Sequence, residues 1–172
     1  AHAGETPPQI CREVLEYSAN AVAALERAVP HVTKNRAEFD RLHNDISCIR
    51  AVSKNYAAKA AAALHVLRFQ RTGLLAELER ARAFLAESLE YYRTLERLTR
   101  DTYRFANSMQ TAQRRIPVVG GANGKPANFH WTEVLPLYEK ELADFDARLA
   151  ALKSGGRAGA QDLGGDGRPA PG

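Results

Sequence analysis

Amide and hydroxyl side chains crowd one short stretch, residues 102–117, which reads TYRFANSMQTAQRRIP. Exposed helix positions more often carry Glu, Lys or Arg, because Asn, Ser and Thr are poorer helix formers. Amides and hydroxyls bond either to a loop backbone or to a ligand that carries hydroxyl groups. Together with an aromatic pair after the next loop, this stretch supplies the candidate ligand-binding set, which is Tyr103, Asn107, Gln110, Gln113, Arg114, His130 and Trp131.

The same residues also have a purely structural interpretation. A loop of about 16 residues, 116–131, separates two predicted helices, and a loop of that length needs side-chain hydrogen bonds to its backbone. Trp131 occupies the position before a helix cap, where an apolar residue often packs back on the first turn. The sequence favours loop anchoring over a ligand site and leaves both open.

Catalytic and metal chemistry find little support. His43 and Asp45 are two residues apart and face different sides of a helix, and Cys48 matches neither. The glycine-rich stretch 120–125 lacks the spacing of a phosphate-binding loop. Cys11 forms no C-x-x-C motif with Cys48, and the register of their helices predicts two free thiols. We therefore predict no catalytic residue, no metal site and no cofactor.

Composition narrows the class of protein further. Hydrophobic residues make up 45% and charged residues 26%, as expected for one soluble globular domain. No stretch reaches the ~20 apolar residues of a membrane span. Lys and Arg total 24 against 20 Asp and Glu, and the two signs alternate along the chain instead of clustering as in nucleic-acid binders. We expect neither a membrane span nor nucleic-acid binding.

Apolar residues recur every three or four positions in four segments, which predicts four amphipathic helices. The first helix starts at Thr6-Pro7-Pro8, ends at Pro30 and turns Ile10, Val14, Tyr17, Ala21, Leu25 and Ala28 to the core. The second starts at an Asn35–Glu38 capping box and ends at Thr72-Gly73. The third runs from about residue 74 to 111–115, and the fourth from a Thr132 cap to about residue 152.

These lengths predict an all-α antiparallel bundle with a long central helix hairpin, flanked by two shorter helices. The central helices, of about 36 and 40 residues, would be about 55–60 Å long, and both shorter helices would cover the same end. Antiparallel register places Tyr103 near His43, with the turn of residues 31–35 close by. Residues 56–92 would then extend as an uncovered arm that docks on another domain or on a second copy.

Residues 154–172 have almost nothing to bury, which predicts a disordered Gly/Pro-rich tail after a single helical domain of residues 1–153. The chain begins at Ala1 instead of Met, as expected of a processed product or a fragment of a longer protein.

Two phrases, TYRFANSMQTAQRRIPV (102–118) and HWTEVLPLYEKELADF (130–145), carry a resemblance that extends over about residues 44–152. This region resembles a helical accessory region near the carboxyl end of large, secreted bacterial proteins that degrade polysaccharides. The resemblance implies a carbohydrate-associated context and a secreted or periplasmic location. It implies no catalytic residues.

The function predicted from residues and resemblance together is a non-catalytic accessory module that assists carbohydrate binding, since aromatic faces with amide donors suit sugars. Two alternatives stay open. One is a stand-alone helical protein that self-associates, and the other is an enzyme with an unrecognised site at the loop end of the bundle.

Overall fold

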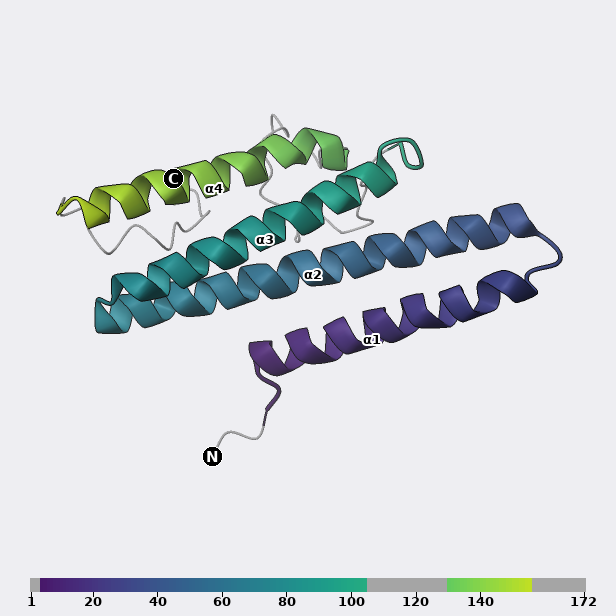
Figure 1. Ribbon diagram of the computed structural model, residues 1–172, viewed down its shortest axis with the longest axis horizontal. Coiled ribbons are helices and arrows are strands. Elements are labelled where there is room, and N and C mark those ends of the chain that lie inside the picture. The colour runs from purple at the N-terminus through teal and green to yellow at the C-terminus, as the bar shows by residue number, and fades with distance from the viewer. Residues whose placement is uncertain (1–3, 105–129, 156–172) are drawn as a thin grey trace, which may run out of the picture.

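Four α-helices dominate the computed structural model, which describes residues 4–104 and 130–155 (Figure 1). The elements are α1 (Pro7–Ala28), the 3-10 turn η1 (Val29–His31), α2 (Arg36–Thr72), α3 (Leu75–Thr99) and α4 (Trp131–Lys153). No strand occurs in the described ranges. The predicted all-α antiparallel bundle is confirmed. The predicted tail lies outside the described residues beyond Gly155, so its separation from a single domain stays a prediction.

The N-cap residues of α1 and α2 have different backbone conformations. Thr6 is the extended N-cap of α1 and is followed by two prolines, as predicted, although its side chain makes no capping bond. Asn35 precedes α2 in the left-handed conformation, with φ of 51° and no side-chain capping bond. The predicted Asn35–Glu38 capping box is therefore wrong. The left-handed backbone turns the Asn35 side chain away from the free N–H groups it would have to reach.

Gly73 makes the turn between α2 and α3. Its φ is +68°, a conformation that costs glycine little because glycine has no Cβ. Its N–H donates to the carbonyl of Phe69 at 2.8 Å and closes the last turn of α2. The predicted break at Thr72-Gly73 is confirmed, and it makes α2 and α3 antiparallel.

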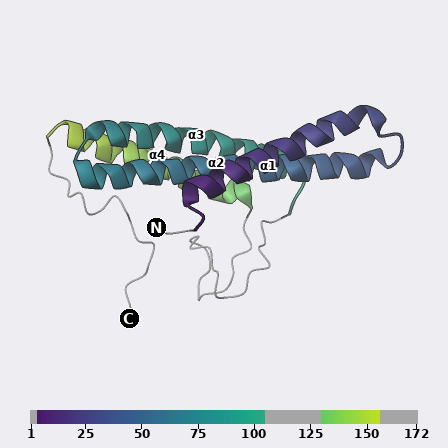
Figure 2. The same ribbon diagram turned by 90° about the horizontal axis from the view of Figure 1, so that it is seen from below.

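The helices lie side by side in chain order, with α2 and α3 in the middle (Figure 1). α1 packs along the N-terminal half of α2, and α4 packs along α3. The turn between α1 and α2 lies beyond the end of α3 (Figure 2). The two outer helices therefore cover opposite ends of the central hairpin, and the prediction that they share one end is wrong.

The cause is the length of α3. It ends at Thr99 instead of continuing past residue 111, and residues 100–104 form turns. α4 starts near that end and runs back along the whole of α3. Three ion pairs mark this path: Arg93 with Glu139 at 2.9 Å, Arg82 with Asp146 at 2.9 Å and Lys153 with Glu79 at 2.6 Å.

α4 therefore covers one side of the arm that we expected to be bare. Phe69, Leu78 and Leu149 form a buried cluster near the hairpin turn. A second cluster lies towards the other end of α3 and comprises Cys48, Ala51, Tyr92, Leu95 and Val134.

Small residues line the contact between α2 and α3. Ala58, Ala62 and Ala81 are almost completely buried, which lets the two helices approach closely. In the same contact between α2 and α3, the side-chain amide of the buried Asn55 donates to the backbone carbonyl and to the hydroxyl of Ser88, at 2.9 and 2.8 Å. A buried amide with both bonds made fixes the register of the hairpin, because sliding either helix would leave it without partners.

Candidate functional site at the start of α4

The structure brings three of the seven predicted site residues together. Tyr103 follows α3, and His130 and Trp131 begin α4. The Trp131 ring lies 5.6 Å from the Tyr103 ring in a tilted arrangement, and 5.6 Å from the His130 ring edge to face. The other four candidates lie outside the described residues; these are Asn107, Gln110, Gln113 and Arg114.

His130 is the N-cap of α4, a role that the sequence had assigned to Thr132. The Nδ1 of its ring accepts a hydrogen bond from the backbone N–H of Thr132 at 3.1 Å, while the backbone N–H of His130 donates to the Glu133 carboxylate at 3.0 Å. Its Nε2 lies 3.2 and 3.1 Å from the carbonyl oxygens of Thr99 and Tyr103. Carbonyls only accept, so the hydrogen sits on Nε2. The imidazole thus joins the end of α3 to the start of α4.

Glu96, which the sequence did not single out, also stabilises the junction between α3 and α4. Its side chain is only 3% exposed, although it is charged. The Arg100 guanidinium donates two hydrogen bonds, of 2.8 and 2.7 Å, to the Glu96 carboxylate, and the Thr132 hydroxyl donates a third at 2.9 Å. The Arg100 guanidinium is the main cause that lowers the pKa of this carboxyl. An i,i+4 Glu–Arg pair is typical of any exposed helix, so the sequence held no signal of its burial.

Tyr103 and Cys48 are poor nucleophiles in this setting. The Tyr103 hydroxyl donates to the Asp45 carboxylate, and burial together with this bond raises the pKa of Tyr103 to about 12. Burial and the charge of Asp45 raise the pKa of Cys48 to about 11. Both groups therefore stay protonated at neutral pH.

The predicted convergence of polar residues is confirmed only in part. Asn44 and Asp45 do reach this end of α3, where the Asn44 amide donates to the Leu98 carbonyl at 3.2 Å. The polar partner of Tyr103 is Asp45 instead of the expected neighbour, His43. The turn of residues 31–35 lies past the end of α3 instead of beside it (Figure 1).

A groove of about 450 Å³ opens beside the Trp131 ring. Its walls are mainly apolar, from Ile49, Val52 and Leu95, and the polar residues Asp45, Ser53, Thr99 and Tyr103 also line it. The groove can hold an apolar or aromatic-stacking group with a few hydrogen bonds at one side.

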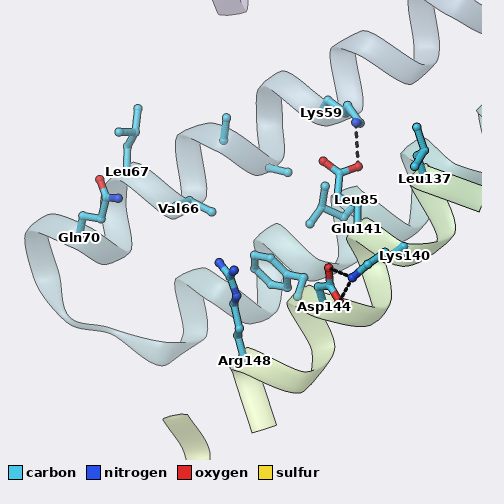
Figure 3. Close-up of a pocket in the computed structure, with 13 residues that line it drawn as sticks. Lys59, Val66, Leu67, Gln70, Leu85, Leu137, Lys140, Glu141, Asp144 and Arg148 are labelled. Carbon is cyan, nitrogen blue, oxygen red and sulfur yellow. Dashed lines mark hydrogen bonds and ion pairs between the residues drawn. The ribbon is translucent and has the colours of Figure 1, made fainter. Parts of the chain in front are cut away.

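A larger hollow of about 740 Å³ lies between α2 and α4 (Figure 3). Its charged side chains include two ion pairs, Lys59 with Glu141 and Lys140 with Asp144, each at 2.7 Å. The lining residues include no Ser, Thr, Cys or His. The Lys59 ammonium also lies 4.0 Å from the centre of the Tyr138 ring, which stacks on Tyr92. Lys59, Glu141, Lys140 and Asp144 are thus all paired with one another within the protein.

Within residues 4–104 and 130–155, no cluster of three or more His, Cys, Asp or Glu side chains could bind a metal ion. No helix in those ranges is long and apolar enough to cross a membrane. Both predicted free thiols are confirmed, with Cys48 buried and Cys11 half-buried.

One comparison with known proteins places this geometry in a context. The chain is similar to one part of a solved carbohydrate-active enzyme. That protein is described as a GH138 enzyme targeting pectin rhamnogalacturonan II, and the match has 43% identity and a TM-score of 0.79. It covers 90% of this chain but only 18% of the enzyme. No protein-family model matches the sequence, and no curated protein matches it.

Proposed function

We propose that this chain is a non-catalytic helical module of a larger carbohydrate-active protein. One observation carries the proposal: nearly the whole chain matches less than a fifth of a GH138 enzyme, at 43% identity. A segment that corresponds to so small a part of an enzyme works with the rest of it.

The bonding at the start of α4 supports a non-catalytic role. The Nδ1, Nε2 and backbone N–H of His130 are all engaged within the protein, and Glu96 accepts three hydrogen bonds. A general base needs a lone pair within reach of a substrate, whereas Glu96 is only 3% exposed and paired with Arg100, and His130 Nδ1 accepts the backbone N–H of Thr132. The competing proposal, an enzyme with an unrecognised site, requires a reactive group other than His130 and Glu96.

Within this role, we propose that the groove beside Trp131 holds a carbohydrate segment. Sugar rings stack their C–H faces on aromatic rings and direct their hydroxyls to polar groups at the edge. Trp131 and Tyr103 supply the rings, and Asp45 supplies an acceptor. The candidates Asn107, Gln110, Gln113 and Arg114 would add donors from the adjoining segment.

The single tryptophan of this chain makes the carbohydrate proposal testable. Titration with rhamnogalacturonan II fragments should change the Trp131 fluorescence in a saturable way. Tyr103→Ala should weaken binding at least ~10-fold, since one stacked ring with its edge contacts contributes about 1.4 kcal/mol or more.

Tyr91→Ala is the matched control, because Tyr91 is also half-buried and also bonds a carboxylate, that of Glu87, but lies on α3 away from the groove. Equal weakening by both variants would refute the groove as the binding site. No binding by the unaltered chain would refute the carbohydrate role while leaving the module proposal intact.

The module proposal has its own test. Immunoblotting of the native protein should detect a polypeptide much larger than 18.9 kDa that contains this sequence. Deletion of residues 1–153 from that polypeptide should leave its catalytic centre chemically intact but lower its stability or its action on long polymers. A native polypeptide of about the present mass would contradict the proposal and favour the self-associating alternative.

A further inference from the structure

Large apolar side chains are exposed mainly on α1 and α2. Among the described residues, nine are strongly exposed, and seven of these belong to α1 or α2. Three lie on α1 with helical spacing: Ile10, Val14 and Tyr17. Three more lie on α2 at intervals of seven residues: Leu42, Ile49 and Tyr56. We call these six residues the apolar face.

The α2 part of this face points away from α3. α2 contacts α3 through residues such as Asn55 and Ala58, which are buried. Tyr56 precedes Ala58 by two residues, or about 200° around a helix, so it lies on the opposite side. Leu42 and Ile49 share that side, because seven residues make nearly two full turns. Ile49 also lines the groove beside Trp131, so the apolar face adjoins that groove.

The α1 part lies on the same side of the molecule. Pro8 and Arg12 of α1 line a hollow of about 460 Å³ that is closed on its other wall by Phe84 of α3. Ile10 follows Pro8 by two residues, and Val14 follows Arg12 by two. Both are therefore turned about 200° from α3.

Register then brings the two stripes together. The Arg50 guanidinium donates to the Ser18 hydroxyl at 2.9 Å, so the middle of α1 lies beside residue 50 of α2. Tyr17 thus lies close to Ile49 along the helix pair. The two stripes therefore lie at the same level on adjacent helices, in contrast to the α3–α4 surface, where ion pairs such as Arg93–Glu139 and Arg82–Asp146 suit contact with water.

We infer that the apolar face docks on an uncharged, apolar surface of a folded domain in the same polypeptide. This inference rests on the proposed function. The match covers only 18% of the enzyme, so a module of this kind has a large tethered neighbour at high effective concentration. Tethering lets a modest apolar surface dock stably, and a face without ion pairs suits a permanent partner better than a transient one. The inferred docking surface lies on α1 and the outer side of α2, and it shares only Tyr56 with residues 56–92, the arm predicted from the sequence to dock.

The test is hydroxyl-radical footprinting of the native longer polypeptide beside the 172-residue chain. Tyr17 and Tyr56 are 66% and 62% exposed in this chain, so docking should lower their labelling about fivefold or more, as expected when a side chain enters an interface core. Tyr91 on α3 should label equally in both. In the longer polypeptide, Ile49→Glu should restore the labelling, because an unpaired charge in an apolar contact is disfavoured.

Leu74→Glu is the matched control. Leu74 is 58% exposed and Ile49 is 59% exposed, but Leu74 lies at the hairpin turn, away from the apolar face. Circular dichroism of both variants should show unchanged helix content, since neither side chain is in the core. If Ile49→Glu loses helix content, Tyr56→Ser replaces it as the probe.

The outcomes separate the two proposals. A longer polypeptide in which Tyr17 and Tyr56 label as in the 172-residue chain overturns the docking inference alone. A native polypeptide of about 18.9 kDa overturns the proposed function and the tethered partner together. Sedimentation of the 172-residue chain gives the third outcome. If the chain forms a dimer that Ile49→Glu dissociates and Leu74→Glu leaves intact, a second copy occupies the apolar face, and the inference is also overturned.

Discussion

Replacement of His130 tests whether this residue joins α3 to α4. His130→Ala removes the N-cap bond to Thr132, at a cost of about 1 kcal/mol, and the Nε2–H bond shared by two carbonyls, at about 1 kcal/mol more. The combined loss is about 2 kcal/mol. His130→Asn keeps a good N-cap but is too short to reach the carbonyls of Thr99 and Tyr103, so it should cost about 1 kcal/mol.

Urea unfolding followed by circular dichroism measures these free energies directly. For a domain of this size, the loss in His130→Ala corresponds to a fall in melting temperature of about 4–8 °C. Trp131 fluorescence, monitored in the same samples, should change early if the junction loosens first. A cost under about 0.5 kcal/mol for His130→Ala would contradict its role at the junction. Equal costs for His130→Asn and His130→Ala would show that capping and bridging are not separate contributions.

Three further predictions concern buried polar groups. Arg100 lowers the pKa of Glu96 in the folded protein. The ionised Glu96 therefore stabilises the fold at a pH above the pKa that it has in the unfolded chain, and this stabilisation is lost as the pH falls through its pKa in the folded protein. Glu96→Gln should then weaken the dependence of the unfolding free energy on pH in the acid range. In the folded chain at pH 8, Cys11 should react with a thiol reagent well before the buried Cys48, whose pKa is raised to about 11, and equal rates would contradict the burial of Cys48. Asn55→Ala should cost about 2–3 kcal/mol in thermal unfolding, because two buried hydrogen bonds to the neighbouring helix are lost; a cost under about 0.5 kcal/mol would show that this amide does not hold the register.

The length of α3 shows where periodicity fails as a guide. The apolar pattern continues past Thr99 through Tyr103 and Phe105, so nothing in the spacing signals an end. In the structure, the Thr99 carbonyl accepts the backbone N–H groups of residues 102 and 103 and lies 3.2 Å from the His130 Nε2. The second contact comes from 31 residues away, and a local pattern cannot report it.

The sequence also predicted the candidate site only in part. Aromatic and amide composition was enough to select Tyr103, His130 and Trp131, which do come together. Glu96 escaped notice because its spacing to Arg100 is that of an ordinary surface pair. Its burial depends on Thr132 of another helix lying over it.

The sequence by itself determined the helical class, the turn at Gly73 and the free thiols. These follow from local or short-range physics: side-chain periodicity, a left-handed turn that favours glycine, and the axial offset between paired helices. Tertiary structure alone decided which apolar stripes are covered. Ile10, Val14 and Tyr17 were predicted to face the core, yet they are exposed, because α1 packs on α2 through the flank that carries Ser18 and Leu25. A stripe shows that a helix face favours burial, but the partner that buries it depends on where every other helix starts and ends.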